Sequence, residues 1–270
     1  MTKARWGQHF LIKESYLTLM LKAANIKKDE LVLEIGPGKG VLTRKLITLS
    51  GRVVALEIDK ELIKYLKNKL GDKENLTIYE GDVRSVVWSE LFKELEKLGY
   101  AKIKLVANLP YYIATQLIID LLRIKSGPEI IVVMVQDEVA RRICAQPGSK
   151  DYSSYSIAIQ YYGESKYITR VPPKAFWPPP KVFSGIVSIT KHVQPLVEVI
   201  SEQKFFYILN AIFTHRRKTL RNCLSGVTGV PPVKKWEEII IAAQLDPKLR
   251  PQNLNIQDIA KLANLVEISQ

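Results

Sequence analysis

The stretch Leu-Val-Leu-Glu-Ile-Gly-Pro-Gly-Lys-Gly, residues 31–40, decides the fold of this chain of 270 residues. Five mostly apolar residues suit a buried strand, and the glycines suit a tight turn that brings the backbone close to a ligand. The segment 41–49 predicts a helix whose first N–H groups face negative charge. The glycine spacing is G-x-G-x-G, and Val41 stands where a dinucleotide fingerprint has its third glycine. The loop therefore favours one small anionic group over a pyrophosphate.

Short apolar runs alternate with amphipathic segments over the first two thirds of the chain, which predicts repeated βαβ units. The expected strands are residues 31–35, 52–56, 76–79, 103–107 and 129–135. The expected helices are residues 41–49, 61–70, 89–98, 114–122 and 138–144. Because strands this apolar are buried on both faces, we expect an α/β fold with a mostly parallel sheet and helices on both faces. Ligands of such sheets lie at the carboxyl ends of the strands.

The last third of the chain has a different pattern. Residues 153–162 fit either a helix or a strand, and we favour the helix; residues 166–170 and 185–190 suit two closing strands. Five prolines in residues 171–182 exclude a strand or helix there and predict a stiff connection that presents Phe176 and Trp177. Further helices are expected at residues 202–213, 218–224, 234–243 and 256–266. We therefore expect a domain of residues 1–190 and a small all-α domain of residues 191–270.

The chain is basic, with 40 Lys and Arg against 27 Asp and Glu and a net charge of +13. A positive charge spread along the chain favours a polyanion, either nucleic acid or an anionic membrane surface, although a lysine-rich surface of a heat-adapted protein is an alternative. Two cysteines and three histidines in no metal-ligand spacing favour neither a zinc site nor disulfides. No apolar stretch approaches the roughly 20 residues of a membrane span, and none suits a signal peptide. We expect a cytoplasmic protein without a metal.

Acidic residues end the second and third expected strands. Glu57 follows Gly36 by 21 residues, where a carboxylate can accept both hydroxyls of a ribose. Asp82 follows the third strand and could accept a hydrogen bond from an adenine amine. A glycine loop and two carboxylates on three successive strand ends describe a nucleoside joined to an amino acid, which is S-adenosylmethionine.

The fourth expected strand ends in Asn108-Leu-Pro-Tyr111. An adenine N6 is a poor nucleophile because its lone pair is delocalised into the ring, so both of its hydrogens must be held while a methyl group approaches in line. The Asn108 side-chain oxygen and the carbonyl of Leu109 or Pro110 can accept these two N–H groups and stabilise the positive charge that develops. Tyr111 offers a flat ring for an unstacked base. The motif therefore indicates adenine methylation.

Six motifs occur in one order along nearly the whole chain. They are Gly7-Gln-His-Phe-Leu11, Leu33-Glu-Ile-Gly-Pro-Gly38, Asn108-Leu-Pro-Tyr111, Met134-Val-Gln-Asp-Glu-Val-Ala-Arg-Arg142, Pro178-Pro-Pro-Lys-Val182 and Phe213-Thr-His-Arg-Arg-Lys-Thr-Leu-Arg-Asn222. With these motifs the sequence resembles the KsgA-type ribosomal RNA adenine dimethyltransferases. The resemblance implies a Rossmann-like class I methyltransferase fold with a small helical C-terminal domain. It also implies four methyl transfers from S-adenosylmethionine, which leaves S-adenosylhomocysteine, to two adjacent adenines in the 3′-terminal hairpin loop of 16S RNA in an immature small subunit.

The resemblance also assigns site residues. It implies a cofactor site of Gln8, His9, Leu11, Gly36, Gly38, Gly40, Glu57, Asp82, Val83 and Asn108. The catalytic positions are Asn108, Leu109, Pro110, Tyr111 and Phe176, with Phe176 stacked on the second face of the target base. Two positions depart from the family: His9 stands where many members carry Asn, and Phe183 where Asp is usual.

Two basic clusters are candidates for contacts with RNA phosphates. One holds Arg216, Arg217, Lys218 and Arg221. If this segment is helical, Arg217 and Arg221 lie four residues apart on one helix face. The other is Arg141 and Arg142, and a solvated helix face is the alternative for both clusters. The target must be an accessible loop, since extracting a paired base costs a few kcal/mol.

Two other functions compete with small-subunit methylation, and we expect a monomer in each case. One is a macrolide-resistance-type methyltransferase of large-subunit RNA, which shares Asn-x-Pro-Tyr, although the Gly-Pro-Gly and Pro-Pro-Lys-Val runs favour the small subunit. The other is a noncatalytic factor for ribosome assembly or transcription. Such a factor need not retain Asn108 beside Tyr111.

Overall fold

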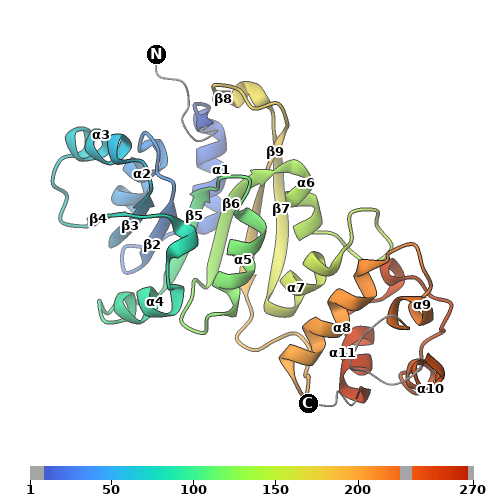
Figure 1. Cartoon of the computed structure of the whole chain (residues 1–270). Helices are drawn as coiled ribbons and strands as arrows, with labels where there is room; N and C mark the ends of the chain where they lie inside the picture. Colours follow the sequence, from blue (N-terminus) through green and yellow to red (C-terminus); the bar gives the residue numbers. More distant parts are fainter. Residues whose placement is uncertain (1–8, 226–232, 267–270) are drawn as a thin grey trace. The chain divides into compact units, whose positions relative to one another are not determined.

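The computed structural model describes residues 9–225 and 233–266 (Figure 1). The chain forms two compact units, which are described separately. Met1–Arg141 and Glu164–His192 belong to the first unit, and Arg142–Gly163 and Val193–Gln270 belong to the second. The domain boundary after residue 190 stays a prediction. The contact pattern differs from it in assigning residues 142–163 to the C-terminal unit.

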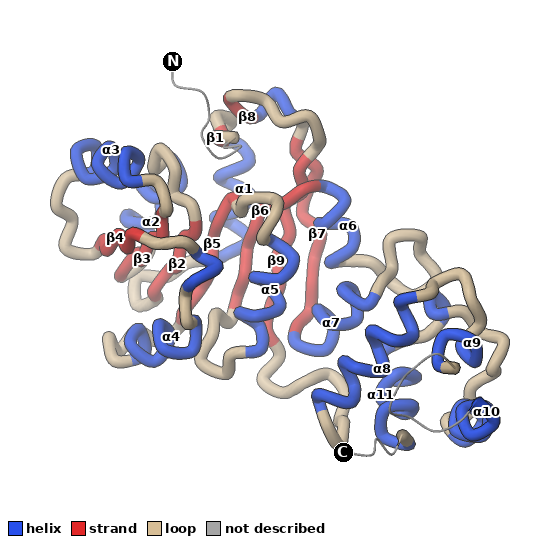
Figure 2. The backbone as a smooth tube through the Cα atoms, in the orientation of Figure 1, coloured by secondary structure: helices blue, strands red, loops and turns tan. Residues whose placement is uncertain are grey.

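The first unit is built on a seven-stranded sheet in the order β4-β3-β2-β5-β6-β9-β7 (Figure 2). Its strands are β2 (Leu31–Ile35), β3 (Arg52–Glu57), β4 (Leu76–Glu80), β5 (Ile103–Asn108), β6 (Ile130–Gln136), β7 (Gly163–Val171) and β9 (Ser184–Lys191). The pairs from β4 through β6 are parallel, whereas β9 runs antiparallel to β6. The α/β fold with a mostly parallel sheet is confirmed, and the strands β2 to β6 begin and end within one residue of the predicted positions.

The helices between these strands are also confirmed within two residues at each end. They are α2 (Val41–Leu49), α3 (Lys60–Leu70), α4 (Trp88–Glu96), α5 (Ala114–Arg123) and α6 (Asp137–Ile143). Side-chain capping explains one start: Asp59 accepts hydrogen bonds from the backbone N–H groups of Glu61 and Leu62, so α3 begins directly after the β3 turn. The crossovers are short, and they hold the carboxyl ends of β2, β3, β4 and β5 together at one edge of the sheet.

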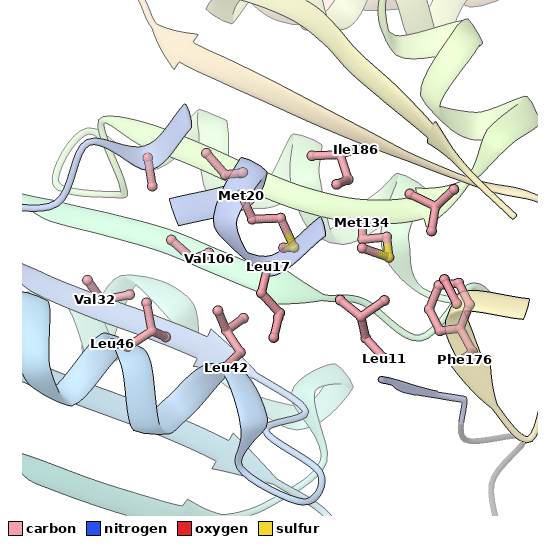
Figure 3. Close-up of a cluster of buried hydrophobic side chains, with 14 of the residues drawn as sticks. Leu11, Leu17, Met20, Val32, Leu42, Leu46, Val106, Met134, Phe176 and Ile186 are labelled. Atoms are coloured by element: carbon pink, nitrogen blue, oxygen red, sulfur yellow. The ribbon is translucent and has the colours of Figure 1, made fainter. Parts of the chain in front are cut away.

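Helix α1 (Glu14–Ala24) is absent from the sequence prediction. Its buried residues Leu17, Met20 and Ala24 have helical spacing, but Lys13 at the N-cap makes no side-chain capping bond, so its start carries no signal. In Figure 3, Leu17 and Met20 lie among side chains of α2, β5, β6 and β9. The helix therefore anchors the N-terminal segment onto the sheet.

The proline-rich segment contains regular structure, which corrects the prediction. Pro173–Ala175 forms one 3-10 turn, and β8 (Phe176–Trp177) pairs antiparallel with β1 (Phe10–Leu11). The Ile12 N–H donates to the Ala175 carbonyl at 2.8 Å. Pairing is possible because Phe176 and Trp177 lie in the proline-free run between Pro173 and Pro178. These hydrogen bonds join residues 10–13 to residues 175–177, which come much later in the sequence.

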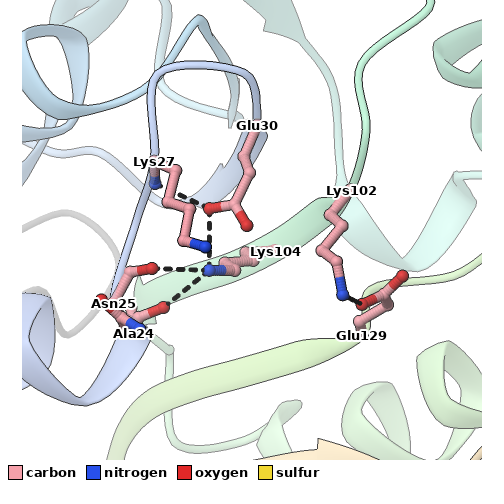
Figure 4. Close-up of polar contacts among 7 residues, drawn as sticks. All are labelled: Ala24, Asn25, Lys27, Glu30, Lys102, Lys104 and Glu129. Atoms are coloured by element: carbon pink, nitrogen blue, oxygen red, sulfur yellow. Dashed lines mark hydrogen bonds and ion pairs between the residues drawn. The ribbon is translucent and has the colours of Figure 1, made fainter.

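A buried ion pair supports the end of α1 (Figure 4). The Lys104 ammonium on β5 lies 2.7 Å from Glu30 Oε2, and both side chains are 3% exposed. It also donates to the carbonyls of Ala24 and Asn25 at 3.0 and 2.8 Å. A cation at a helix C-terminus satisfies carbonyls that the helix leaves without partners. The interaction explains a charged residue inside an otherwise apolar strand.

The second unit is helical in its described residues. It contains α7 (Ser154–Tyr162), α8 (Glu202–Thr214), α9 (Leu220–Leu224), α10 (Val233–Ala242) and α11 (Ile256–Leu265). The helix chosen for residues 153–162 is confirmed, and its ambiguous pattern arises because seven of its nine residues are buried. Tyr161 of α7 stacks on Phe205 of α8 with ring centroids 4.9 Å apart. Aromatic packing therefore forms part of this core.

The expected helix over residues 218–224 is shorter in the structure. Residues 215–218 form a turn, and α9 begins only at Leu220. The N–H groups of Leu220 and Arg221 donate to the carbonyls of Leu249 and Pro247, so the segment before α9 follows a different path. Arg217 and Arg221 are therefore not on one helix face, and the predicted spacing between them is wrong.

Candidate functional site

A cavity lies at the carboxyl ends of β2, β3 and β5, as expected for a parallel sheet of this kind. Most of the predicted cofactor residues line it: His9, Leu11, Gly36, Gly38, Glu57, Asp82, Val83 and Asn108. Leu109, Pro110 and Tyr111 line the same cavity. The structure thus brings together the glycine loop, the two acidic residues and the Asn-Leu-Pro-Tyr motif. Gln8 lies outside the described residues.

The glycine loop needs its glycines for two different reasons. Gly36, Gly38 and Gly40 all have positive φ, in the region that favours glycine. A Cβ on Gly38 would come within 3.0 Å of the Phe10 ring, so this position keeps the cavity mouth open. A Cβ on Gly40 would lie 2.6 Å from Leu66, and Gly40 is the N-cap of α2 rather than a cavity residue. The expectation that Gly40 contacts a cofactor is therefore replaced by a packing role.

Glu57 is buried at the end of β3, 4% exposed. Its Oε1 accepts from the N–H groups of Ile58 and Asp59 at 3.0 Å, and its Oε2 accepts from Gly38 at 3.2 Å. Burial raises the pKa of Glu57, while these backbone N–H groups act in the opposite direction. A carboxylate has about four acceptor sites, so a ligand hydroxyl can still bind beside the three backbone donors.

Asp82 follows β4 and faces the cavity beside Val83. It accepts from the Arg84 N–H at 2.9 Å and from Arg84 Nε at 3.0 Å. The Arg84 hydrogen bond lowers the pKa of Asp82, so this carboxyl stays ionised and remains an acceptor at neutral pH. The Arg84 guanidinium also lies 5.9 Å from the centre of the exposed Tyr112 ring.

Asn108 is the last residue of β5, and its amide has a defined orientation. The amide nitrogen donates to the His9 carbonyl at 3.2 Å. A carbonyl only accepts, so the contact fixes the NH₂ group toward His9 and leaves Oδ1 on the opposite side of the amide. The Pro110 carbonyl accepts from the Ile113 N–H at 3.3 Å. Asn108 therefore lines the cavity with an amide whose nitrogen is held by the His9 carbonyl.

The ring of Tyr111 is held at a fixed angle. Its hydroxyl shares a 2.7 Å hydrogen bond with Ser184 Oγ on β9, and burial raises the pKa of Tyr111, which stays protonated. The His9 ring lies 6.3 Å away at an interplanar angle of 27°. His9 Nδ1 is 2.7 Å from the Pro178 carbonyl and donates to it. The proline-rich segment thus orients His9.

Phe176 is buried in this structure. It is 2% exposed, packs in the hydrophobic cluster beside Leu11 and Ala175, and does not line the cavity (Figure 3). Burying a Phe side chain contributes about 1.5–3 kcal/mol, which explains why the apolar ring faces the core. The exposed aromatic residue of the pair is Trp177, 46% exposed, with Lys39 Nζ 5.3 Å from its ring. The stacking of Phe176 on the target base therefore stays a prediction, and in this structure the ring faces the core.

Sequence reasoning missed Glu34. This residue of β2 lines the cavity at 2% exposure, and its Oε2 has no hydrogen-bond partner among the described residues. Burial raises the pKa of Glu34 to about 8. An acidic residue inside an apolar strand, two positions before the glycine loop, was the available signal.

Replacing Glu34 with glutamine should change how stability depends on pH. The pKa in the folded chain, about 8, lies above the ordinary value of 4.5, so the folded state binds the proton more tightly. The free energy of unfolding should therefore fall between about pH 4.5 and pH 8 in the parent chain and fall less in Glu34→Gln. Denaturant unfolding at several pH values measures this. Identical pH profiles would show that Glu34 is not buried as described.

The candidate RNA-binding arginines have different surroundings. Arg141 Nη1 lies 2.9 Å from Asp137 in the first unit, and Arg142 is exposed at the start of the second. In the second unit, Arg216 donates to the Lys150 carbonyl at 3.0 Å, and Arg221 pairs with Glu237 at 3.3 Å. Arg217 and Lys218 are exposed in the turn before α9.

The described residues contain neither a cluster of metal-binding side chains nor a membrane-spanning helix. Across residues 9–225 and 233–266, no three His, Cys, Asp or Glu side chains are grouped as a metal site would need. In the same part of the chain, no helix has the length and apolar character to cross a bilayer.

The sheet order and the positions of the site residues define the class of the first unit. The neighbouring strands β4, β3, β2, β5 and β6 are parallel, and β9 pairs antiparallel with β6. A glycine loop follows the central strand β2. Carboxylates follow β3 and β4. This is the architecture of a class I methyltransferase, with an Asn-Leu-Pro-Tyr motif after β5.

Comparison with known proteins identifies the family. The family model for ribosomal RNA adenine dimethylase matches residues 1–267, and the chain belongs to this family. It is 40% identical over 259 residues to the ribosomal RNA small subunit methyltransferase A of Halothermothrix orenii, covering 96% of this chain and 86% of that one. The protein of the same name from Bacillus cytotoxicus is 41% identical over 264 residues, with coverage of 97% and 90%.

Solved structures resemble the chain over most of its length. The crystal structure of a dimethyladenosine transferase from Plasmodium falciparum has a TM-score of 0.79 at 28% identity, covering 94% of this chain and 96% of that one. The structure of the 23S rRNA methyltransferase ErmE has a TM-score of 0.72 at 23% identity, with coverage of 95% and 99%. At that identity the second resemblance concerns the fold alone.

Proposed function

We propose that this protein transfers methyl groups from S-adenosylmethionine to N6 of two adjacent adenines in the 3′-terminal hairpin loop of 16S RNA. The products are N6,N6-dimethyladenosines, and the reaction accompanies maturation of the small ribosomal subunit. Membership of the ribosomal RNA adenine dimethylase family supports the reaction, and relatives named small subunit methyltransferase A support the subunit. The observation that carries the proposal is the place of Asn108 in the cavity wall, where its amide nitrogen donates to the His9 carbonyl.

The cavity residues fit S-adenosylmethionine. The backbone near Gly36 and Gly38 admits a methionine carboxylate, because a Cβ at Gly38 would close the approach beside Phe10. Glu57 accepts the ribose hydroxyls, and Asp82 with Val83 holds the adenine. Glu34 adds a buried carboxyl whose Oε2 has no hydrogen-bond partner among the described residues, which is a feature of a ligand cavity. When bound, the cofactor supplies an electrophilic methyl group on a sulfonium.

The Asn-Leu-Pro-Tyr motif prepares the target amine. Asn108 Oδ1 and the carbonyl of Leu109 or Pro110 accept its two N–H groups, since a carbonyl oxygen has two lone pairs and Pro110 can accept beside its bond from Ile113. The two oxygens localise the nitrogen lone pair and stabilise the positive charge that forms on N6. No strong base is required before the attack, and the proton released afterwards is acidic enough to pass to water. Tyr111, fixed by Ser184, supports one face of the adenine ring.

RNA phosphates contact Arg141 in the first unit and, in the second unit, Arg142 and the turn before α9. Their contact with phosphates suits the net charge of +13. A target base in a single-stranded loop avoids the cost of unpairing. We further propose that the protein acts as a cytoplasmic monomer.

Replacing Arg217 or Arg221 with alanine should weaken binding to unmethylated small subunits and flatten its salt dependence. Each lost phosphate contact lowers the slope of log K against log salt by about 0.7–0.9. The effect of Arg217→Ala should exceed that of Arg221→Ala, because Arg221 already shares its charge with Glu237. Binding titrations at several salt concentrations measure the slopes. Slopes equal to that of the parent chain would make both arginines ordinary surface residues.

Incubation with labelled S-adenosylmethionine and purified ribosomal subunits tests the choice of subunit. Label should enter the RNA of unmethylated small subunits and not that of large subunits. Label confined to large-subunit RNA would support a macrolide-resistance activity. Binding to small subunits without any label would support a noncatalytic assembly factor. Either of these two results would refute the proposed function.

A further inference from the structure

A buried carboxylate holds two arginines beside the active-site strands. Asp137, 5% exposed, follows β6 and pairs with Arg141 Nη1 at 2.9 Å and Arg170 Nε at 3.3 Å. The Tyr167 hydroxyl donates to its other oxygen at 2.7 Å. Together with Phe183, these residues form what we call the Asp137 cluster: Asp137, Arg141, Tyr167, Arg170 and Phe183. All of them belong to the first unit.

Phe183 gives this cluster an unusual surface. The Arg170 guanidinium carbon lies 3.7 Å from the centre of the Phe183 ring, a close stacked contact. Phe183 is 39% exposed. An Asp at this position would place a second carboxylate beside Arg170. With Phe183, the guanidinium keeps its orientation and its charge is not neutralised a second time.

The cluster is joined to the catalytic motif through one strand pair. The Asp137 N–H donates to the Phe183 carbonyl at 3.0 Å, and the next residue, Ser184, pairs with Gln136 in the β6 to β9 ladder. Ser184 Oγ is in turn 2.7 Å from the Tyr111 hydroxyl. Phe183, which stacks on Arg170, is therefore the residue directly before Ser184, which holds the Tyr111 ring.

The charges of the cluster suit a phosphate. Asp137 neutralises one of the two guanidinium groups, so the pair of arginines and the carboxylate together carry one positive charge. The Arg141 and Arg170 side chains are 45% and 56% exposed, although Asp137 beneath them is buried. A guanidinium has five N–H donors in a planar fork, and Arg170 uses its Nε for Asp137, which aims the rest of the fork.

We propose that the Asp137 cluster binds the phosphate next to the target adenine, with Arg170 as the contacting residue and Phe183 as its positioning residue. This inference rests on the proposed function, since it assigns part of the same RNA-binding surface. The two pairs with Asp137 join a buried carboxylate to guanidinium groups that are about half exposed. Their effect is to hold the arginine fork in one direction before RNA arrives, which lowers the entropic cost of binding.

Four variants test the assignment: Arg170→Ala, Arg170→Lys, Phe183→Ala and, as the matched control, Arg44→Ala. Arg44 is an exposed arginine on α2 and lies outside the cavity. Binding of unmethylated small subunits is measured at several salt concentrations, together with KM and kcat for methylation. Affinity for S-adenosylmethionine and thermal unfolding serve as checks that each variant is folded.

Arg170→Ala should raise KM by about 3- to 10-fold with little change in kcat, and reduce the salt slope by about 0.7–0.9. Arg170→Lys should keep the slope, because the charge remains, and Phe183→Ala should raise KM by a smaller factor. Arg44→Ala should match the parent chain. A loss of affinity without a change in slope, or a fall in kcat at constant KM, would overturn the proposal. A loss of affinity at constant slope would indicate that the cluster stacks on a base. A fall in kcat at constant KM would indicate that the cluster only supports Tyr111. If the parent chain does not methylate small subunits, it is the proposed function that fails.

Discussion

Replacing Asn108 with alanine should reduce methyl transfer to small-subunit RNA by about 100- to 1,000-fold, as measured for single oxygen or N–H contacts to a developing charge. The variant loses the acceptor for one N6 hydrogen, and it loses the amide that donates to the His9 carbonyl at 3.2 Å. Cofactor affinity should therefore decrease but not disappear, since Gly38, Glu57 and Asp82 still line the cavity. Single-turnover rates with labelled cofactor, together with direct binding of the cofactor, separate the two effects.

The matched control for this variant is Asn68→Ala. Asn68 is exposed on α3 and does not line the cavity, so the same chemical change should leave the rate unaltered. Full activity in Asn108→Ala would contradict the mechanism. Complete loss of cofactor binding would show that Asn108 acts mainly on the cofactor site instead of the adenine.

Replacing Lys104 with alanine should lower the free energy of unfolding by about 3–5 kcal/mol. The substitution leaves the Glu30 carboxylate, 3% exposed, without its cation, and it removes the donor to the Ala24 and Asn25 carbonyls at the end of α1 (Figure 4). Denaturant unfolding of the purified protein measures the change.

Lys102→Ala is the control for this prediction. Lys102 pairs with Glu129 at 2.6 Å two residues earlier in sequence, but both side chains are about half exposed (51% and 50%; Figure 4). Its loss should cost no more than about 1 kcal/mol. Equal effects of the two substitutions would mean that Lys104 is hydrated and that its pair with Glu30 does not stabilise the fold.

Much of the first unit can be predicted from its sequence because local and tertiary preferences agree. The strands β2 to β6 are short, apolar and bounded by turn residues, so their pattern has one interpretation. Helix α1 was missed because it has no capping side chain at Lys13, although Leu17, Met20 and Ala24 bury one face. The pairing of β1 with β8 joins residues far apart in sequence, and no local pattern reveals such a contact.

The site was predicted where strand ends determine position, and less well elsewhere. Glu57 and Asn108 end β3 and β5, Asp82 follows β4 by two residues, and the sheet brings them to one cavity. The burial of Phe176 was not predicted because the sequence shows an aromatic residue but not whether its ring faces the core or solvent. The prediction that Arg217 and Arg221 share a helix face was wrong because α9 begins only at Leu220. The N–H groups of Leu220 and Arg221 donate to the carbonyls of Leu249 and Pro247. Glu34 was overlooked because an acidic residue in a buried strand resembles an exception to the apolar pattern.

The central claim is that Asn108 and the neighbouring main-chain carbonyl hold the amino group of an unstacked adenine. Mass spectrometry of nucleosides and fragments from small-subunit RNA, treated with the enzyme and S-adenosylmethionine, tests it most directly. Two neighbouring adenines near the 3′ end should each gain two methyl groups on N6 with the parent chain, and neither should do so at a comparable rate with Asn108→Ala. Methyl groups on another base or another ring position, or an unchanged pattern in the variant, would contradict the claim.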